Sequence, residues 1–473
     1  MFRLYVLLGG VIILSACDVG KDYTIKEYLS YDEIRQTLKS NDKTEYVDKN
    51  WYEVFGDKDL NTLLTQIKKS NLTIAQSKER LLQARYLFFI NSKNYLPTLD
   101  GNFEYDFSKT NNKADSINNS DFFRFGFDAS WEIDLWGMNK NISKQYVELI
   151  NKADYNVADI VITIESEVIS NYVYLRLAQE KLKITKKNIS LQEDVYKIVK
   201  NKYLAGTEDE LALNQALYLL EKTKADIPDI IVDIEKYKNA LYVLSGKTKN
   251  NFIINLDKFD KNITKKTFKY NVQKLYQIPL DSIRTRPDVK IAEAQVKAQN
   301  ASLNQSIIAL FPSISLQAGF GFLSPSGNTL FNNQSEIYGY NPIFSVPIWQ
   351  WGKLTNNIEL QKHIREEYIL NYNEVMLTAL FEIKNSITNI EQALKEASLL
   401  KKSYESMKNV FEITKSKYKN GLVDFVEVTE SEKNFLEAEN VYLKANAKVL
   451  LNITSFYKAT GGGYKFRNQV KRF

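Results

Sequence analysis

The chain has 473 residues, and 63 Lys and Arg against 57 Asp and Glu give it a formal net charge of +6. A single Cys and a single His exclude a disulfide framework and a Cys/His metal site, so no metal is expected. No Lys- or Arg-rich stripe is interleaved with stacking aromatics, so we expect no nucleic-acid partner.

Residues 1–16 are predicted to be a secretory signal peptide, with Arg3 as its only charge. Its ending, Leu14-Ser15-Ala16-Cys17, resembles a bacterial lipobox, which implies cleavage before Cys17 and covalent lipid on that residue. Several acyl chains would hold the N-terminus to a membrane. The alternative is a free cysteine behind an ordinary signal. Asp18 resembles an inner-membrane retention signal of enteric bacteria, and its effect on sorting stays open.

Residues 17–56 are expected to form a lipidated, extended arm. The rest of the chain is predicted to be a tandem duplication. Adding 215 to the number of one landmark gives its counterpart: Pro97 and Pro312, Trp136-Gly137 and Trp351-Gly352, Gly206 and Gly421, Gly246 and Gly461. We therefore expect repeat one at 57–246 and repeat two at 286–461. A connector at 247–285 joins them, and a tail follows at 462–473.

Each repeat is predicted to begin with a helix and to contain a very long one, at 138–205 and 353–420, where Gly and Pro are absent. A helix of that length would span ~100 Å. Apolar residues recur every seventh position, the pattern of helices that supercoil left-handedly. They are Val161, Val168, Leu175, Leu182, Ile189, Tyr196 and Tyr203, then Met376, Ile383, Ile390, Ala397, Tyr404, Phe411 and Tyr418. Return helices are expected at 208–246, interrupted by Pro228, and at 423–460.

Between the two helices of each repeat the hydrophobic period changes from 3.6 to 2, which predicts β-hairpins at about 97–136 and 312–351. A polar loop is expected at 109–120. One face of each hairpin is apolar, and the other face of the first hairpin is acidic. The acidic residues are Asp100, Glu104, Asp106, Asp128, Glu132 and Asp134.

A soluble sandwich and a membrane barrel both fit alternating strands. An acidic face is hard to pack inside a sandwich, and four Trp residues gather where the strands end, so the barrel is favoured. Four strands cannot close a barrel and open edges are not tolerated in lipid, so the chain must oligomerise. The expected fold class is mixed and mainly α.

Three motifs carry a family resemblance: Cys17-Asp18-Val19-Gly20-Lys21-Asp22-Tyr23, Trp51-Tyr52-Glu53-Val54-Phe55-Gly56-Asp57 and Arg286-Pro287-Asp288-Val289. In this order, with the repeat, they resemble the outer-membrane efflux protein family of TolC and OprM type. The match is closest to the lipoprotein branch that serves resistance-nodulation-division pumps. Lys21 replaces that branch's proline, and Ala212 stands where many relatives carry Asp.

The resemblance implies a homotrimer with a 12-stranded β-barrel in the outer membrane, four strands per protomer, and a long helical barrel in the periplasm. It also implies a periplasmic adaptor, which would contact the hairpin turns at Gly206, Thr207, Gly421, Leu422 and Val423, and an inner-membrane resistance-nodulation-division transporter.

The acidic residues after the second turn, Asp424, Glu427 and Glu430, are candidates for a periplasmic gate. Glu427 and Glu430, three apart, share a helix face and match by position the family's acidic constriction, usually aspartates. Threefold symmetry would bring them together as rings of like charge. The alternative is a solvated acidic face that suits the helix dipole.

No catalytic set, phosphate loop or metal cluster is present in the sequence, so we expect neither an enzyme nor a cofactor beyond the lipid. The expected function is a passive, gated exit duct for small molecules, with an acidic lumen that favours cations. A type I export duct for polypeptides is one alternative. A lipid-anchored coiled-coil scaffold without a pore is another. The sequence names neither cargo nor pump.

Overall fold

The computed structural model describes residues 23–38, 51–112, 116–252, 254–257 and 282–462. The chain divides into two compact units. The sheet unit comprises Met1–Glu27, Arg80–Asp154 and Ile291–Asn373. The helical unit comprises Tyr28–Glu79, Tyr155–Lys290 and Glu374–Phe473. Cys17, residues 258–281 of the expected connector and residues 463–473 of the expected tail lie outside the described residues.

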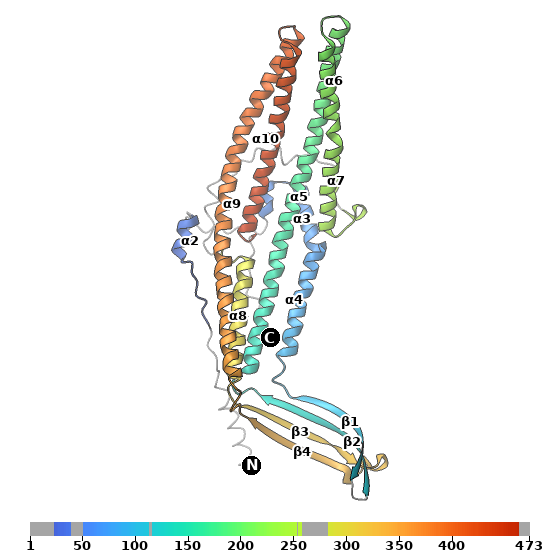
Figure 1. The fold of residues 1–473 in the computed structure, drawn as a ribbon, viewed down its shortest axis with the longest axis vertical. Helices are drawn as coiled ribbons and strands as arrows, with labels where there is room; N and C mark the ends of the chain where they lie inside the picture. Colours follow the sequence, from blue (N-terminus) through green and yellow to red (C-terminus); the bar gives the residue numbers. More distant parts are fainter. Residues whose placement is uncertain (1–22, 39–50, 113–115, 253, 258–281, 463–473) are drawn as a thin grey trace. The chain divides into compact units, whose positions relative to one another are not determined.

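The sheet unit contains one antiparallel sheet in the order β1-β2-β3-β4 (Figure 1). Its strands are β1 at Thr98–Asn112, β2 at Ser116–Ile133, β3 at Ser313–Ser324 and β4 at Glu336–Ser345, with short 3₁₀ turns at Gly327–Thr329 and Asn333–Ser335 before β4. The first hairpin lies where it was expected, but its strands are longer, because β1 and β2 pair through most of the predicted polar loop at 109–120. Strand pairing is made by the backbone, so polar side chains do not end it.

The strand register separates the two faces of the sheet. Asp100, Asp128, Gly319 and Gly339 are cross-strand neighbours on one face. One residue along, Phe127, Phe320 and Tyr338 are neighbours on the other face, and all three are exposed. The alternation expected for a sheet that is polar on one side and apolar on the other is therefore present across all four strands. β1 and β4 are its edges.

The helix expected at the start of repeat one is not continuous. It is divided into α3 at Lys58–Ser70 and α4 at Leu72–Asn91. Asn71 has an extended backbone, and its side-chain oxygen accepts from the backbone N–H of Ile74 at 2.9 Å. An Asn in this role starts a new helix and satisfies one of its free N–H groups. In repeat two, α8 at Pro287–Ile308 begins at the equivalent point.

The longest helices are α5 at Met138–Leu204 and α9 at Lys353–Lys419, each of 67 residues. The return segment of repeat one consists of α6 at Glu210–Ala225 and α7 at Ile227–Ser245, with Pro228 in the first turn of α7. In repeat two the return is one helix, α10 at Phe425–Ala459. Among the described residues, no helix combines the length and apolar character needed to cross a membrane.

The seven-residue seam is buried unevenly. Val168 and Leu175 on α5 are fully buried, as are Met376, Ile383 and Ile390 on α9. Towards the end of α5 the seam reaches the surface, and the last of its positions, Tyr203, is 38% exposed in the protomer.

The expected extended arm at 17–56 contains regular structure: α2 at Tyr31–Leu38 and a 3₁₀ turn at Trp51–Phe55. The helix starts because Ser30 and Glu33 form a capping box, in which the Ser30 N–H and hydroxyl donate to the Glu33 carboxylate and the Glu33 N–H donates to the Ser30 hydroxyl. The turn is fixed by Trp51, whose ring stacks on that of Tyr457 with centroids 4.6 Å apart.

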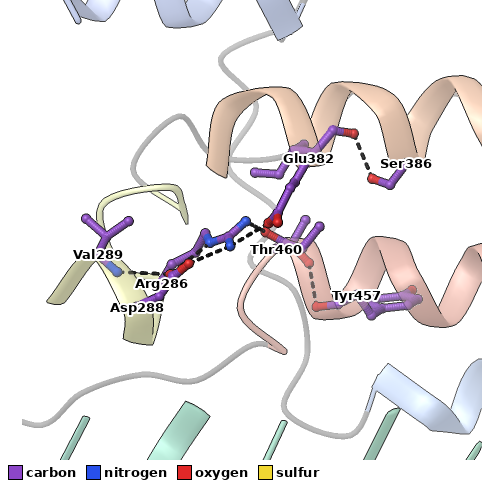
Figure 2. Close-up of polar contacts among 9 residues, drawn as sticks. Arg286, Asp288, Val289, Glu382, Ser386, Tyr457 and Thr460 are labelled. Carbon is purple, nitrogen blue, oxygen red and sulfur yellow. Dashed lines mark hydrogen bonds and ion pairs between the residues drawn. The ribbon is translucent and has the colours of Figure 1, made fainter. Parts of the chain in front are cut away.

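Arg286, from the Arg-Pro-Asp-Val motif, joins three helices of the helical unit (Figure 2). Its guanidinium donates to the carboxylates of Asp288 and Glu382 at 2.7 Å each. It also donates at 2.7 Å to the carbonyl of Ala459, the last residue of α10. Arg286 is 7% exposed, so its guanidinium is shielded from water, while the carboxylates of Asp288 and Glu382 stay partly exposed. Hydrogen bonds between charged groups are stronger than those between neutral groups.

Candidate functional site: the helical hairpin tips

The two tips of the helical unit are the turns after α5 and α9. The N–H of Gly206 donates to the carbonyl of Tyr203 at 2.9 Å, and that of Thr207 donates to the carbonyl of Lys202 at 2.9 Å. Gly421 and Leu422 repeat the pattern at 3.0 Å each. This is the Schellman ending of a helix, and it requires the left-handed backbone that both glycines adopt, with φ of 72° and 73°.

An aspartate begins the helix after each turn. The Asp209 carboxylate accepts from the N–H of Ala212 at 2.8 Å, and the Asp424 carboxylate accepts from the N–H of Glu427 at 3.0 Å. The two aspartates are 215 positions apart, so the tips are equivalent in detail. Asp424, predicted as part of the gate, is placed as a helix cap.

A compact apolar cluster lies directly behind the tips. The rings of Phe411 and Phe435 stack 5.5 Å apart and nearly parallel, and Val428 is fully buried beside them. α5 contributes Val195 and Val199, and α6 contributes Ala212 and Ala216. This packing holds four helix segments together, so the positions of surface residues on α10 depend on it.

Tyr418 joins the two tips. The Lys202 ammonium lies 3.9 Å from the centroid of its ring and donates to its backbone carbonyl at 3.3 Å. The Tyr418 hydroxyl donates to the Glu208 carboxylate at 3.0 Å. Burial, and then the neighbouring carboxylate, raise the pKa of the phenol, so it stays protonated and keeps donating. The sequence predicts Tyr418 only as a seam position, although a tyrosine there brings a hydroxyl into an apolar seam.

Glu427 and Glu430 are both exposed, on the face of α10 opposite to the buried Phe425 and Val428. They are therefore free to meet their symmetry mates in an assembly. A further carboxylate, Glu432, is 4% exposed and faces the interior. The spacing of Glu432 along the helix places it on the inward face of α10, although Glu430, two residues before it, faces outwards.

The structure places five of the six acidic residues of the first hairpin on β1 and β2. Asp100 is the cross-strand neighbour of Asp128, which accepts from Asn102 at 2.7 Å and pairs with Arg124 at 3.3 Å. The remaining three on the strands are Glu104, Asp106 and Glu132. Asp134 differs: it follows the end of β2, and its carboxylate accepts from the backbone N–H of Lys140 at 3.2 Å.

A hollow of about 580 Å³ lies against the sheet. Its polar lining includes Asp100, Arg124, Asp128, Gln317 and Asn341. Groups of His, Cys, Asp or Glu able to hold a metal ion are absent from the described residues.

Comparison with known proteins decides the family. The family model for the outer membrane efflux protein matches residues 63–247 and 279–462, once in each repeat. The chain belongs to the outer membrane efflux protein family. The resemblance seen in the motifs is thereby confirmed.

Curated relatives of this family match almost the whole chain. The cation efflux system protein CusC of Escherichia coli O6:H1 is 24% identical, over 96% of this chain and 97% of the relative. A probable outer membrane lipoprotein, SilC of Salmonella typhimurium, is 23% identical over 98% of this chain and all of the relative.

Solved structures of the family share the fold. The outer-membrane channel OprN superposes with a TM-score of 0.83 at 22% identity, covering 94% of this chain and 99% of that one. The CmeC channel of Campylobacter jejuni gives 0.82 at 23% identity, covering 95% and 96%. The predicted fold class, mainly helical with four strands per chain, is confirmed.

Membership in this family makes the chain a non-enzymatic outer-membrane channel of an efflux system, with its helical part in the periplasm. The predicted function, an outer-membrane efflux channel, and the predicted location in the outer membrane are confirmed.

Proposed function

We propose that three copies of this chain form a passive, gated duct, in which small molecules delivered from an inner-membrane pump leave the cell. The observation that carries this proposal is the four-stranded sheet: it is polar on one face, exposes aromatic residues on the other and ends in two edge strands. Such a sheet satisfies its backbone in lipid only when copies join edge to edge. Twelve strands from three copies make a barrel wide enough to conduct.

The periplasmic gate is formed by Glu427 and Glu430. Both are exposed in the protomer, and threefold symmetry would make each a ring of three carboxylates. Asp424 supports them as the cap of α10. Tyr418, at the end of α9, holds the second helical tip to the first through its contacts with Lys202 and Glu208. Opening the tips therefore requires these contacts to break.

The turns themselves offer a docking surface for a periplasmic adaptor. Leu204 and Leu422, one at each tip, are both 72% exposed. Apolar side chains this exposed at a helix end fit an apolar partner surface. Gly206, Thr207, Gly421 and Val423 complete the two turns. The lipoprotein-branch motifs favour a resistance-nodulation-division transporter as the pump of a tripartite system.

The cargo is proposed to be cationic. Asp100, Glu104, Asp106, Asp128 and Glu132 lie on the strands, and Arg124 forms an ion pair with one of them, Asp128. A lumen with net negative charge concentrates cations. The relative CusC is named for cation efflux, which agrees with this assignment.

Lipid on Cys17 is proposed as the membrane anchor. The residue lies outside the described residues, so the support is the Leu-Ser-Ala-Cys sequence and the likeness to SilC, whose name describes a probable lipoprotein. Mass spectrometry of the intact mature chain tests it, because cleavage before Cys17 with added acyl chains gives one defined mass.

Purified mature protein inserted into a planar bilayer tests the duct. We expect a native mass of three chains and cation-selective currents. A monomer, or an inserted protein without currents, would contradict the proposal and favour the scaffold without a pore.

A further inference from the structure

A pocket of about 550 Å³ lies within the sheet unit, between α4, α5 and α8, where these helices approach the sheet (Figure 1). Its described lining residues all differ from those of the hollow against the sheet, so the two are separate. Pockets of this volume accommodate small ligands. The duct described above gives this one no role.

The lining of the pocket combines cations with apolar side chains. Lys140 and Lys144 belong to the first two turns of α5, and Lys297 belongs to α8, where it pairs with Glu293 at 2.7 Å. The apolar part of the lining consists of Tyr23, Phe88, Val147, Val296 and Ala301. Glu148 also lines it, and burial raises the pKa of that carboxyl, which weakens its opposition to an anion. We call this site the lysine pocket.

The two lysines of α5 lie close to the level at which the sheet ends. Trp136, just before α5, donates from its indole N–H to the carbonyl of Pro312, just before β3, at 2.6 Å. Tryptophans of membrane proteins gather at the boundary between hydrocarbon and headgroups. Lys140 and Lys144 follow Trp136 by four and eight residues, which is ~6 and ~12 Å along a helix.

The headgroup layer on each side of a bilayer is ~5–8 Å deep. Side chains of a helix lean towards its N-terminus, which for α5 is the end next to the sheet. Lys140 therefore lies at headgroup depth, and the long side chain of Lys144 leans back towards it.

The N-terminal arm indicates which side of the barrel the pocket faces. Tyr23 of the arm lines the pocket, and the Arg365 guanidinium lies 4.6 Å from the centroid of its ring. Tyr23 is six residues from Cys17, and six residues span at most ~20 Å. Lipid on Cys17 has to insert outside the barrel. The pocket beside Tyr23 is therefore within reach of the lipid headgroups around the barrel.

We propose that the lysine pocket binds the headgroup of an anionic phospholipid from the periplasmic leaflet of the outer membrane. Lys140 and Lys144 hold the phosphate as charged hydrogen-bond donors. Phe88 and Val296 give an apolar wall to the glycerol and the first carbons of the acyl chains. The inference rests on the proposed barrel and lipid anchor, and it adds a second, non-covalent attachment of the duct to the membrane.

Native mass spectrometry of the full-length trimer in detergent tests the pocket by counting bound lipid. The probe is phosphatidylglycerol, compared with zwitterionic phosphatidylcholine of the same acyl chains. We expect the wild type to prefer phosphatidylglycerol. The double variant Lys140→Gln, Lys144→Gln should bind it about tenfold more weakly, because each basic residue at an anionic headgroup strengthens binding several-fold. Binding of phosphatidylcholine should not change.

The matched control is the double variant Lys353→Gln, Lys362→Gln. It removes the same charge from exposed positions on α9 of the same unit, and it should bind phosphatidylglycerol as the wild type does.

Ser143→Glu is a second variant within the pocket. It adds a carboxylate to the wall that carries the two lysines and should abolish the preference for the anionic lipid, whereas Ser143→Ala should keep it.

Glycerol 3-phosphate, which has no acyl chains, distinguishes a lipid site from a site for free phosphate. We expect it not to displace phosphatidylglycerol at equal concentration, and displacement would overturn the lipid assignment. Equal binding of phosphatidylglycerol by the wild type and the Lys140→Gln, Lys144→Gln variant would overturn the site. Trimers that conduct alongside that result would leave the duct standing. Wild-type protein that binds the lipid through these lysines but carries no current would refute the duct alone.

Discussion

Asn71 and Arg286 hold equivalent places in the two repeats, and each donates a side-chain hydrogen bond to a backbone carbonyl, one from an amide and the other from a guanidinium. The Asn71 amide donates to the carbonyl of Leu244 at 2.7 Å, and the Arg286 guanidinium donates to that of Ala459 at 2.7 Å. Each bond ties the first helix of a repeat to the end of its return helix, 173 residues away in both cases. Only the arginine also reaches two carboxylates.

Arg286→Met should therefore destabilise the helical unit. The loss includes the bond to Ala459 and two charged hydrogen bonds, worth ~1.5–3 kcal/mol each before discounting the partial exposure of Asp288 and Glu382. Thermal unfolding followed by circular dichroism would measure it. The control is Lys362→Met, which removes an exposed pair with Glu359 and should leave the midpoint nearly unchanged.

Tyr418→Phe should loosen the tips while preserving the ring. The change removes the hydroxyl that donates to Glu208 and keeps the contact with Lys202, so single-channel conductance is expected to rise. The matched control is Tyr203→Phe, the equivalent position in repeat one, where the side chain is 38% exposed. Equal currents from Tyr418→Phe and wild type would show that this bond does not restrain the duct.

Gly321→Ala should prevent assembly of the sheet. A Cβ at this position would clash with the backbone oxygen of Phe125 on the neighbouring strand, so β2 and β3 would have to separate. The control is Gly339→Ala, where a Cβ meets nothing within 4 Å. Heat-modifiable mobility in gels measures folding of the barrel, and normal folding of Gly321→Ala would contradict the close pairing.

Neutralising the strand carboxylates together, as Asp100→Asn, Glu104→Gln and Asp106→Asn, should lower cation selectivity. The reversal potential in a salt gradient measures this, and it should move towards zero. Asp134→Asn is the control, because Asp134 follows β2 and accepts from the Lys140 N–H. An unchanged reversal potential in the triple variant would show that these residues do not set the cation selectivity of the duct.

Much of the architecture could be predicted because it depends on local patterns. Alternation along 98–107 and 122–133 fixes strands, and the glycines at 206 and 421 end helices wherever they occur. The break at Asn71 and the helix after Ser30 could have been predicted as N-caps, but both lie in polar segments where periodicity is weak.

The candidate site could be predicted only in part, because its missing members depend on packing between distant helices. Tyr418 meets Glu208 across 210 positions, and no spacing rule connects them. Glu432 lies in the same acidic run as Glu427 and Glu430. Its spacing from Val428 puts it on the inward face of α10, but only the packed structure shows that it is buried. The oligomer that would bring the gate carboxylates together depends on contacts between chains.

Single-channel recording of the wild type and of the Glu427→Ala, Glu430→Ala double variant tests the central claim most directly. We expect small or flickering currents in the wild type that grow in the variant, because the ring of carboxylates narrows and closes the duct. Identical currents from the two proteins would contradict the gate. The absence of current from both proteins, when both are shown to have inserted, would contradict the duct itself.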